Sequence, residues 1–117
     1  MSEGKNKALF VVDTQDHSYH VNFRYSESRG ARNTWCEIDV YKWDTSQYHA
    51  GSKKIAEACG LTRCAPTDNF CRATGRKRAL ARALFQLTGI WKEIYSQEEI
   101  RQLRKRFWDR YFNVCKA

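Results

Sequence analysis

Alternating apolar and polar positions mark the first half of the chain as β-structure. Residues 7–13 form a short apolar run that ends at Asp13, and residues 19–25 then alternate with a period of two. The same period returns over residues 34–43, after the turn-rich segment SESRGARN at 26–33. Because the side chains of a strand point alternately to its two faces, these patterns predict three half-buried strands, with a hairpin loop at 26–33.

The third predicted strand has two different faces. One face carries Cys36, Ile38 and Val40, whereas the other mixes aromatic and acidic side chains, namely Trp35, Glu37, Asp39, Tyr41 and Trp43. A mixed face of this kind is unusual for simple exposure to solvent, so we expect it to pack under a helix or against a partner subunit. Residues 53–64 suit a helix turn or a fourth strand about equally, and we favour the strand.

The second half of the chain changes to the helical period. Apolar residues recur at helical spacing at Ala79, Leu80, Ala83, Leu84 and Leu87. Good N-caps occur at Thr74 and at the Asp68–Asn69 pair, and Thr88-Gly89 is expected to close this helix. Ser96-Gln97-Glu98-Glu99 is a capping box that predicts a last helix. Its apolar stripe is formed by Ile100, Leu103, Phe107, Tyr111 and Val114.

Strands followed by helices predict the architecture of the domain. We expect a single α+β domain over residues 1–117, with an N-terminal antiparallel sheet of three or four strands followed by two C-terminal α-helices. The apolar run at 8–12 is too short for a signal sequence or a membrane span, so we expect a cytoplasmic protein with no membrane partner. Five cysteines without a zinc-finger spacing predict reduced thiols, no metal and no cofactor.

Charge is distributed unevenly along the chain. Residues 1–71 contain nine Lys or Arg and nine Asp or Glu. Residues 72–117 contain twelve Lys or Arg against four acidic residues, which accounts for the whole net charge of +8. Eight of these twelve are arginines, whose planar guanidinium group matches two phosphate oxygens at once. The excess is either a solvated basic surface or, as we favour, an anion-binding surface.

The start of the first predicted helix is the strongest local feature. Arg76, Lys77 and Arg78 crowd the helix N-terminus, where the helix dipole already disfavours cations. Either Asp68 and the helix cap offset this charge, or a bound phosphate does so near Arg76 and Arg78. Phe70 next to Asn69 suggests a base-binding pair, although a phenylalanine at a helix start is more often a hydrophobic staple.

Residues that carry out catalysis are sparse in this sequence. His17, His20 and His49 are isolated, and the chain contains neither a glycine-rich phosphate loop nor a nucleophile elbow. We therefore expect a binding protein and not an enzyme.

The order of these segments resembles a known family. A sheet is followed by a Pro/Asp/Phe turn, a GRK-type helix and a helix with an Ile/Trp/Tyr/Arg pattern, as in the Thoeris anti-defence proteins of bacteriophages. The resemblance covers residues 7–114 in layout and residues 63–84 in motif. It implies dimers or larger rings that sequester cyclic ADP-ribose-type signals or cyclic oligonucleotides without cleaving them, in the cytoplasm of a bacterial host. Asn69 and Phe70 are then candidates for holding bases, and Arg24 with Arg101 or Arg104 for holding phosphates.

Two other partners are compatible with the same residues. A nucleic-acid-binding module would use the basic helices as an open surface that follows a phosphate backbone. A protein-binding inhibitor of a host enzyme is the other alternative. The surplus of aromatic residues, including Trp108 and Phe112 outside the main stripe of the last helix, also predicts a homo-oligomer.

Overall fold

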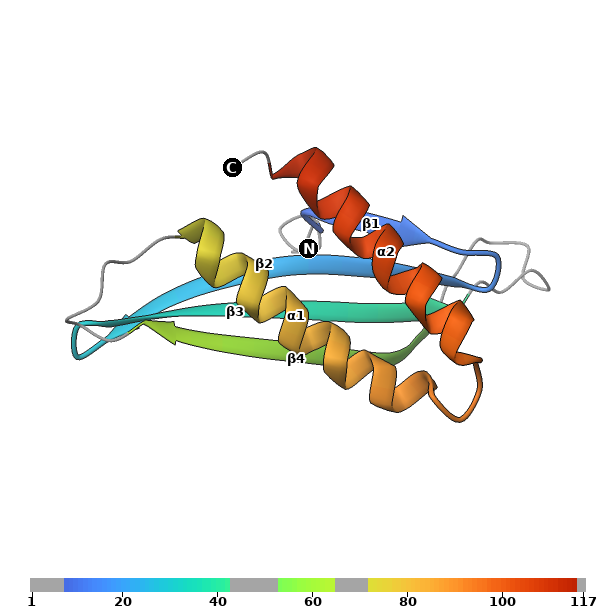
Figure 1. The fold of residues 1–117 in the computed structure, drawn as a ribbon. Coiled ribbons are helices and arrows are strands. Elements are labelled where there is room, and N and C mark those ends of the chain that lie inside the picture. The colour runs from blue at the N-terminus through green and yellow to red at the C-terminus, as the bar shows by residue number, and fades with distance from the viewer. Residues whose placement is uncertain (1–7, 43–52, 65–71, 116–117) are drawn as a thin grey trace.

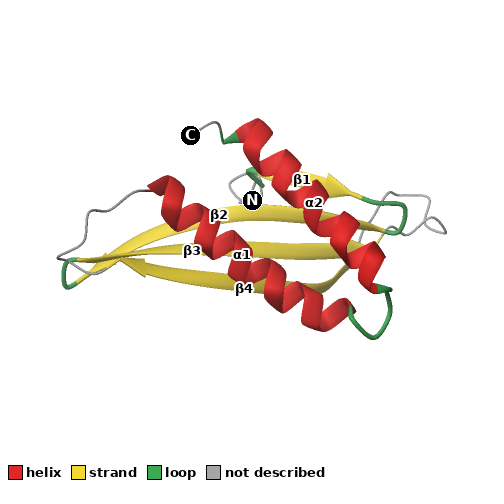
Figure 2. Ribbon diagram, in the orientation of Figure 1, coloured by secondary structure: helices red, strands yellow, loops and turns green. Residues whose placement is uncertain are grey.

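The computed structural model describes residues 8–42, 53–64 and 72–115, which form an antiparallel sheet with two helices on one face (Figures 1 and 2). The sheet has the order β1-β2-β3-β4. This is the predicted α+β layout, and the strand interpretation of residues 53–64 is confirmed. The elements are β1 (Phe10–Asp13), β2 (His17–Ser28), β3 (Ala31–Lys42), β4 (Lys53–Cys64), α1 (Arg72–Trp91) and α2 (Gln97–Val114).

The hairpin between β2 and β3 is longer than its sequence pattern predicts. Ser28 pairs with Ala31, so the loop expected at 26–33 is reduced to Arg29 and Gly30. Both turn residues have positive φ, 53° for Arg29 and 82° for Gly30. Such a turn matches the right-handed twist of the flanking strands, which allows the ladder to continue to its tip.

Both helices cover the same face of the sheet, and the core lies between this face and the helices. The alternation in β3 has the expected sides, because Cys36, Ile38 and Val40 are fully buried whereas Trp35 is exposed. Tyr19 and Val21 of β2 join this core together with the apolar stripes of the helices. The mixed face, expected to pack under a helix or against a partner subunit, is the face that neither helix covers (Figure 2), which leaves the partner subunit as the alternative.

The helix α1 lies very close to β4. An added Cβ at Gly60 would lie 2.2 Å from the Ala79 carbonyl oxygen and 2.6 Å from the Ala83 nitrogen. Near the helix N-terminus, a Cβ at Gly75 would lie 2.7 Å from Thr34 Oγ1 of β3. Two glycines on opposite sides of the interface therefore set the position of α1 on the sheet.

The expected ends of α1 need correction. Thr74 is not its N-cap, since the helix has already begun at Arg72, while Asp68 and Asn69 lie outside the described residues. The helix also continues past Thr88-Gly89 to Trp91, whose side chain is buried and lies 5.0 Å from the His17 ring. Burial of a tryptophan offsets the cost of about 1 kcal/mol for a glycine inside a helix.

The helix α2 begins at the predicted capping box. Ser96 Oγ accepts from the Glu99 amide at 3.1 Å, and Glu99 Oε1 accepts from the Ser96 amide at 2.8 Å. Ile100, Phe107 and Tyr111 are buried as expected. Val114 is exposed, so the buried stripe ends at Tyr111.

Helix side chains form hydrogen bonds with backbone groups of both edge strands, β1 and β4. On β4, Arg82 donates to the Leu61 carbonyl, and the Gln86 side-chain oxygen accepts from the Cys59 amide at 2.8 Å. On β1, Arg106 donates to the Asp13 carbonyl and Arg110 Nε donates to the Val11 carbonyl at 3.3 Å. These contacts block edge-to-edge pairing with another strand at these positions.

Several large apolar side chains remain exposed in the protomer. Phe85 on the outer side of α1 is 81% exposed, and Leu9, Trp35 and Ile55 are exposed on the strands. Trp43, expected on the same face as Trp35, lies outside the described residues. No described helix has the length and apolar character needed to cross a membrane.

Candidate anion-binding site

The helix α1 is strongly and exclusively cationic. Its 20 residues contain no Asp or Glu, and its cations are Arg72, Arg76, Lys77, Arg78 and Arg82. Four of the five lie in its first two turns, where the N-terminal partial charge of the helix is also positive. The N-terminal end of α1 is therefore a concentrated region of positive potential.

Neutral aromatic residues hold the first two arginines. The Arg72 guanidinium carbon lies 4.5 Å from the centroid of the Tyr25 ring. Arg76 donates from Nε to the Tyr111 hydroxyl at 3.3 Å and from Nη1 to the Tyr25 hydroxyl at 3.5 Å. The hydrogen bond to Tyr25 raises the pKa of Arg76 further above its ordinary value, so the group is permanently charged. Hydroxyl and ring partners orient a guanidinium without cancelling its charge.

A third cation extends this cluster toward the end of α2. Lys77 Nζ lies 5.5 Å from the centroid of Phe112, whose ring stacks on Trp108 at 5.8 Å. Phe112 and Tyr25 are both partly open to solvent. Figure 1 shows how these elements meet, with the N-terminal end of α1 and the C-terminal end of α2 at the same end of the molecule. We call Arg72, Arg76, Lys77, Tyr25, Tyr111 and Phe112 the α1 cluster.

A surface depression adjoins the α1 cluster. It has a volume of about 600 Å³, within the range of roughly 300–1,000 Å³ typical of ligand sites. Arg72 and Tyr25 line it from the cluster, and Arg32 with Asn33 lines it from β3. Glu27 also lines it and lies 3.9 Å from Arg32, so one carboxylate faces a group of guanidinium ions. The Asn33 side-chain oxygen is buried and has no hydrogen-bond partner among the described residues.

The cations of α2 are engaged differently. Arg101 pairs with Glu98 at 2.9 Å and Lys105 pairs with Asp109 at 3.3 Å. Arg106 and Arg110 are committed to the carbonyl groups of β1. By contrast, within the described part of the chain no carboxylate pairs with Arg72, Arg76, Lys77 or Arg78. Among the described residues, cations without a carboxylate partner are therefore densest in the first two turns of α1, while on α2 neither a carboxylate nor a carbonyl group pairs with Arg104.

The residues predicted from sequence lie on separate surfaces of the protomer. Arg76 belongs to the α1 cluster, and Arg78 is exposed two residues further along the same helix. Arg24 lies on the uncovered face of the sheet, where it pairs with Glu37 at 2.5 Å. Arg101 and Arg104 lie in the N-terminal half of α2, toward the opposite end from Tyr111. Asn69 and Phe70 lie outside the described residues.

Sequence reasoning missed the aromatic partners of the site. Tyr25 was assigned only as the end of a strand pattern and Tyr111 only to the apolar stripe of the last helix. The spacing of Arg72 and Arg76, one helical turn apart, is the one local signal that places two guanidinium groups side by side. Nothing in the spacing indicates that a tyrosine 51 positions earlier contacts Arg76.

Ser18, His20 and Asp13 are the residue types of a hydrolase triad, but their hydrogen bonds do not run in the order of a triad. The Ser18 hydroxyl donates to Asp13 Oδ1 at 2.7 Å and lies 3.1 Å from His20 Nε2. Because its one proton goes to Asp13, Ser18 accepts from His20, which therefore does not act as its base. No set of three metal-ligating side chains is found among the described residues. These groups stabilise the β1–β2 hairpin.

His17 is a buried titratable group beside Trp91. Its Nδ1 lies 3.3 Å from the Tyr95 hydroxyl, and burial lowers its pKa from 6.5, against an opposing effect of Asp16. The unfolded chain therefore takes up a proton at a pH where the folded protein resists it. We expect the contribution of His17 to the free energy of unfolding to be fully present above pH 6.5 and to decrease as the pH falls below this value. Urea titrations over this range should show the decrease flattened in His17→Gln, with His20→Gln as the control; an unchanged slope in His17→Gln would contradict this assignment.

No family model, curated protein or solved structure matches the chain. The functional proposal therefore rests on the geometry of the α1 cluster and on the family resemblance of the sequence.

Proposed function

We propose that this protein binds a nucleotide-type phosphate ligand at the α1 cluster and holds it without cleaving it. The observation that carries the proposal is a helix with five cations and no acid, whose first arginines contact Tyr25 and Tyr111 and, among the described residues, no carboxylate. Accumulated cations at a helix N-terminus destabilise the free protein, and a phosphate would offset this cost. Each charge-assisted hydrogen bond to it would contribute about 1.5–3 kcal/mol.

The chemistry of the neighbouring side chains supports a nucleotide over a simple anion. Tyr25 and Phe112 present partly exposed rings close to the cations, and rings of this kind stack on bases. The depression beside Arg72 is also large enough for more than a phosphate group. Together with the resemblance to the Thoeris anti-defence proteins, this favours sequestration of a cyclic ADP-ribose-type molecule or a cyclic oligonucleotide.

Calorimetric titration distinguishes this function from nucleic-acid binding. Cyclic ADP-ribose and cyclic di- and trinucleotides should be compared with a short DNA duplex at two salt concentrations. We expect saturable binding of one of the small nucleotides at a fixed stoichiometry, with the ligand recovered intact after denaturation. Binding of DNA alone, with an affinity that falls steeply with salt, would instead indicate a nucleic-acid-binding protein that contacts the phosphate backbone. Four cations of α2, Arg101, Lys105, Arg106 and Arg110, already have partners within the protein, which is a reason to expect the first result.

We also propose that the protein assembles into a homo-oligomer. Phe85 projects from the outer side of α1, and Trp35 with Ile55 marks the uncovered face of the sheet. Exposed apolar groups of this size are typical of interfaces. Sedimentation at micromolar concentration should show a dimer or a larger species, and a strict monomer would contradict the proposal. The same surfaces are the basis of the alternative function, binding to a host protein.

A further inference from the structure

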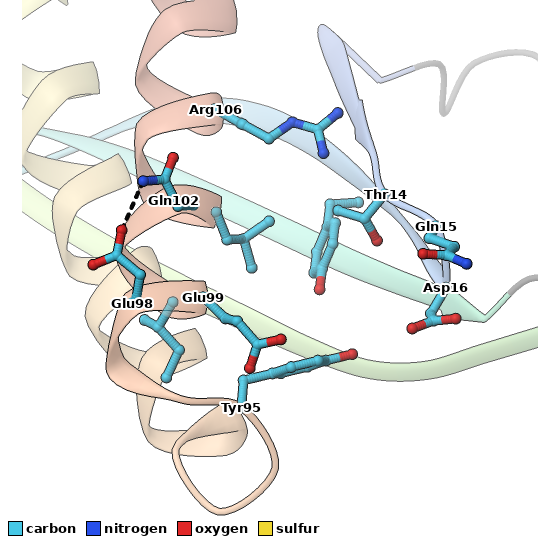
Figure 3. Close-up of a pocket in the computed structure, with 11 residues that line it drawn as sticks. Thr14, Gln15, Asp16, Tyr95, Glu98, Glu99, Gln102 and Arg106 are labelled. Carbon is cyan, nitrogen blue, oxygen red and sulfur yellow. Dashed lines mark hydrogen bonds between the residues drawn. The ribbon is translucent and has the colours of Figure 1, made fainter.

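A second cavity lies at the other end of α2 from the α1 cluster. It is open to solvent, has a volume of about 320 Å³ and is lined by the β1–β2 turn and the first turns of α2 (Figure 3). Glu99 lines it, whereas Tyr111 of the α1 cluster follows twelve residues later on the same helix. At 1.5 Å per residue the two regions are separated by about 18 Å, so they are distinct sites within a protomer.

The inner wall of this cavity is apolar except for one hydroxyl group. Ile100 and Leu103 line it beside Tyr19, which is 1% exposed. Burial raises the pKa of Tyr19, so the hydroxyl keeps its proton. A ligand in the cavity would therefore meet an apolar wall that carries one protonated hydroxyl group.

The rim of the cavity carries negative charge in an otherwise basic protein. Asp16 reaches it from the β1–β2 turn and Glu99 from the first turn of α2. No described cation pairs with either carboxylate, although one oxygen of Glu99 accepts from the Ser96 amide in the capping box. Figure 3 shows Asp16, Glu99 and Tyr95 on one side of the cavity and Arg106 on the opposite side. The Arg106 guanidinium is already directed to the Asp13 carbonyl of β1.

We propose that this cavity binds a small organic cation with a flat apolar body, of the amidinium, guanidinium or aromatic amine class. Asp16 and Glu99 receive the cationic N–H groups, since carboxylates accept two parallel hydrogen bonds from a planar cation. Ile100 and Leu103 cover the apolar body, and the Tyr19 hydroxyl donates to an acceptor on it or to a water carried with it. The size of the cavity limits the ligand to about one substituted ring.

Three isosteric probes test the charge requirement directly. Benzamidine, benzamide and benzoate share a ring and differ in carrying a cation, a neutral amide and an anion. Calorimetric titration or ligand-detected NMR should give saturable binding of benzamidine, binding of benzamide about ten- to hundred-fold weaker, and no binding of benzoate. Equal binding of benzamidine and benzamide, or no saturable binding of benzamidine at millimolar concentration, would overturn the proposal.

Matched variants locate the binding. Asp16→Asn and Glu99→Gln remove a charge at the rim, and glutamine keeps the capping box. Each should weaken benzamidine binding about ten-fold or more, whereas Glu93→Gln, which removes an exposed charge outside the cavity, should leave it unchanged. Nucleotide binding at the α1 cluster should be the same in all three variants. An equal loss in Glu93→Gln would show that benzamidine responds only to the overall charge of the protein.

Discussion

Gly60→Ala is expected to lower the free energy of unfolding by about 3 kcal/mol, at the upper end of the cost of overpacking a core. The added methyl group would lie 2.2 Å from the Ala79 carbonyl oxygen, 2.6 Å from the Ala83 nitrogen and 2.8 Å from Arg82 Cβ. Two of these three atoms belong to the helix backbone and cannot rotate away. The helix α1 must therefore move off β4, which exposes Leu80, Ala83 and Leu84. Chemical denaturation followed by circular dichroism measures this loss.

Gly89→Ala is the matched control for this prediction. Gly89 lies in α1, the helix that packs against Gly60, and its added methyl group would meet no atom within 4 Å. Alanine inside a helix is more favourable than glycine by roughly 0.5–1 kcal/mol, so this variant should be slightly more stable than the unchanged protein. If Gly60→Ala unfolded at the same denaturant concentration as the unchanged protein, α1 would not lie on β4 at the described distance.

Arg76→Gln is expected to weaken nucleotide binding about ten- to hundred-fold, the second large effect. Among the described cations, Arg76 is the one that donates hydrogen bonds to two tyrosines, Tyr25 of β2 and Tyr111 of α2. Its loss removes both a charge and the preorganised N–H donors that a phosphate requires. Arg76→Lys should recover only part of the affinity, because an ammonium group does not match the two phosphate oxygens as a guanidinium does. Calorimetric titration with the bound nucleotide gives these affinities.

Arg101→Gln controls for the change in net charge. It removes the same charge from α2, where Arg101 is exposed and paired with Glu98. We expect its nucleotide affinity to stay close to that of the unchanged protein and its salt dependence to be similar. A loss as large as that of Arg76→Gln would place the phosphate on α2, as the family resemblance alone suggests for Arg101 and Arg104.

Local sequence signals predict most of this fold correctly. The alternation in residues 34–43 identifies the buried face of β3, because a strand with one buried face allows only one phase of the pattern. The capping box predicts the start of α2, since Ser96 and Glu99 need only each other. The end of α1 was misjudged at Thr88-Gly89 because the burial of Trp91 against His17 is a long-range contact.

The role of each cation could not be predicted from the sequence. Residues 72–117 contain the whole charge excess, yet Arg82, Arg106 and Arg110 bind backbone carbonyl groups at the sheet edges. Such arginines protect unpaired strand edges and contribute less to ligand binding than the composition suggests. The cations that remain for a ligand are distinguished by contacts with Tyr25, Tyr111 and Phe112, which only the packing of α1 against β2 and α2 creates.

Arginine side-chain NMR tests the central claim most directly. The Nε–Hε resonances of the labelled protein should be followed during titration with cyclic ADP-ribose and with a cyclic dinucleotide. Our account predicts that the resonances of Arg72 and Arg76 shift and saturate together with one of these ligands, while those of Arg101 and Arg104 stay in place. Saturating shifts confined to Arg101 and Arg104, or no shift of Arg72 and Arg76 with either nucleotide, would contradict a nucleotide site at the α1 cluster.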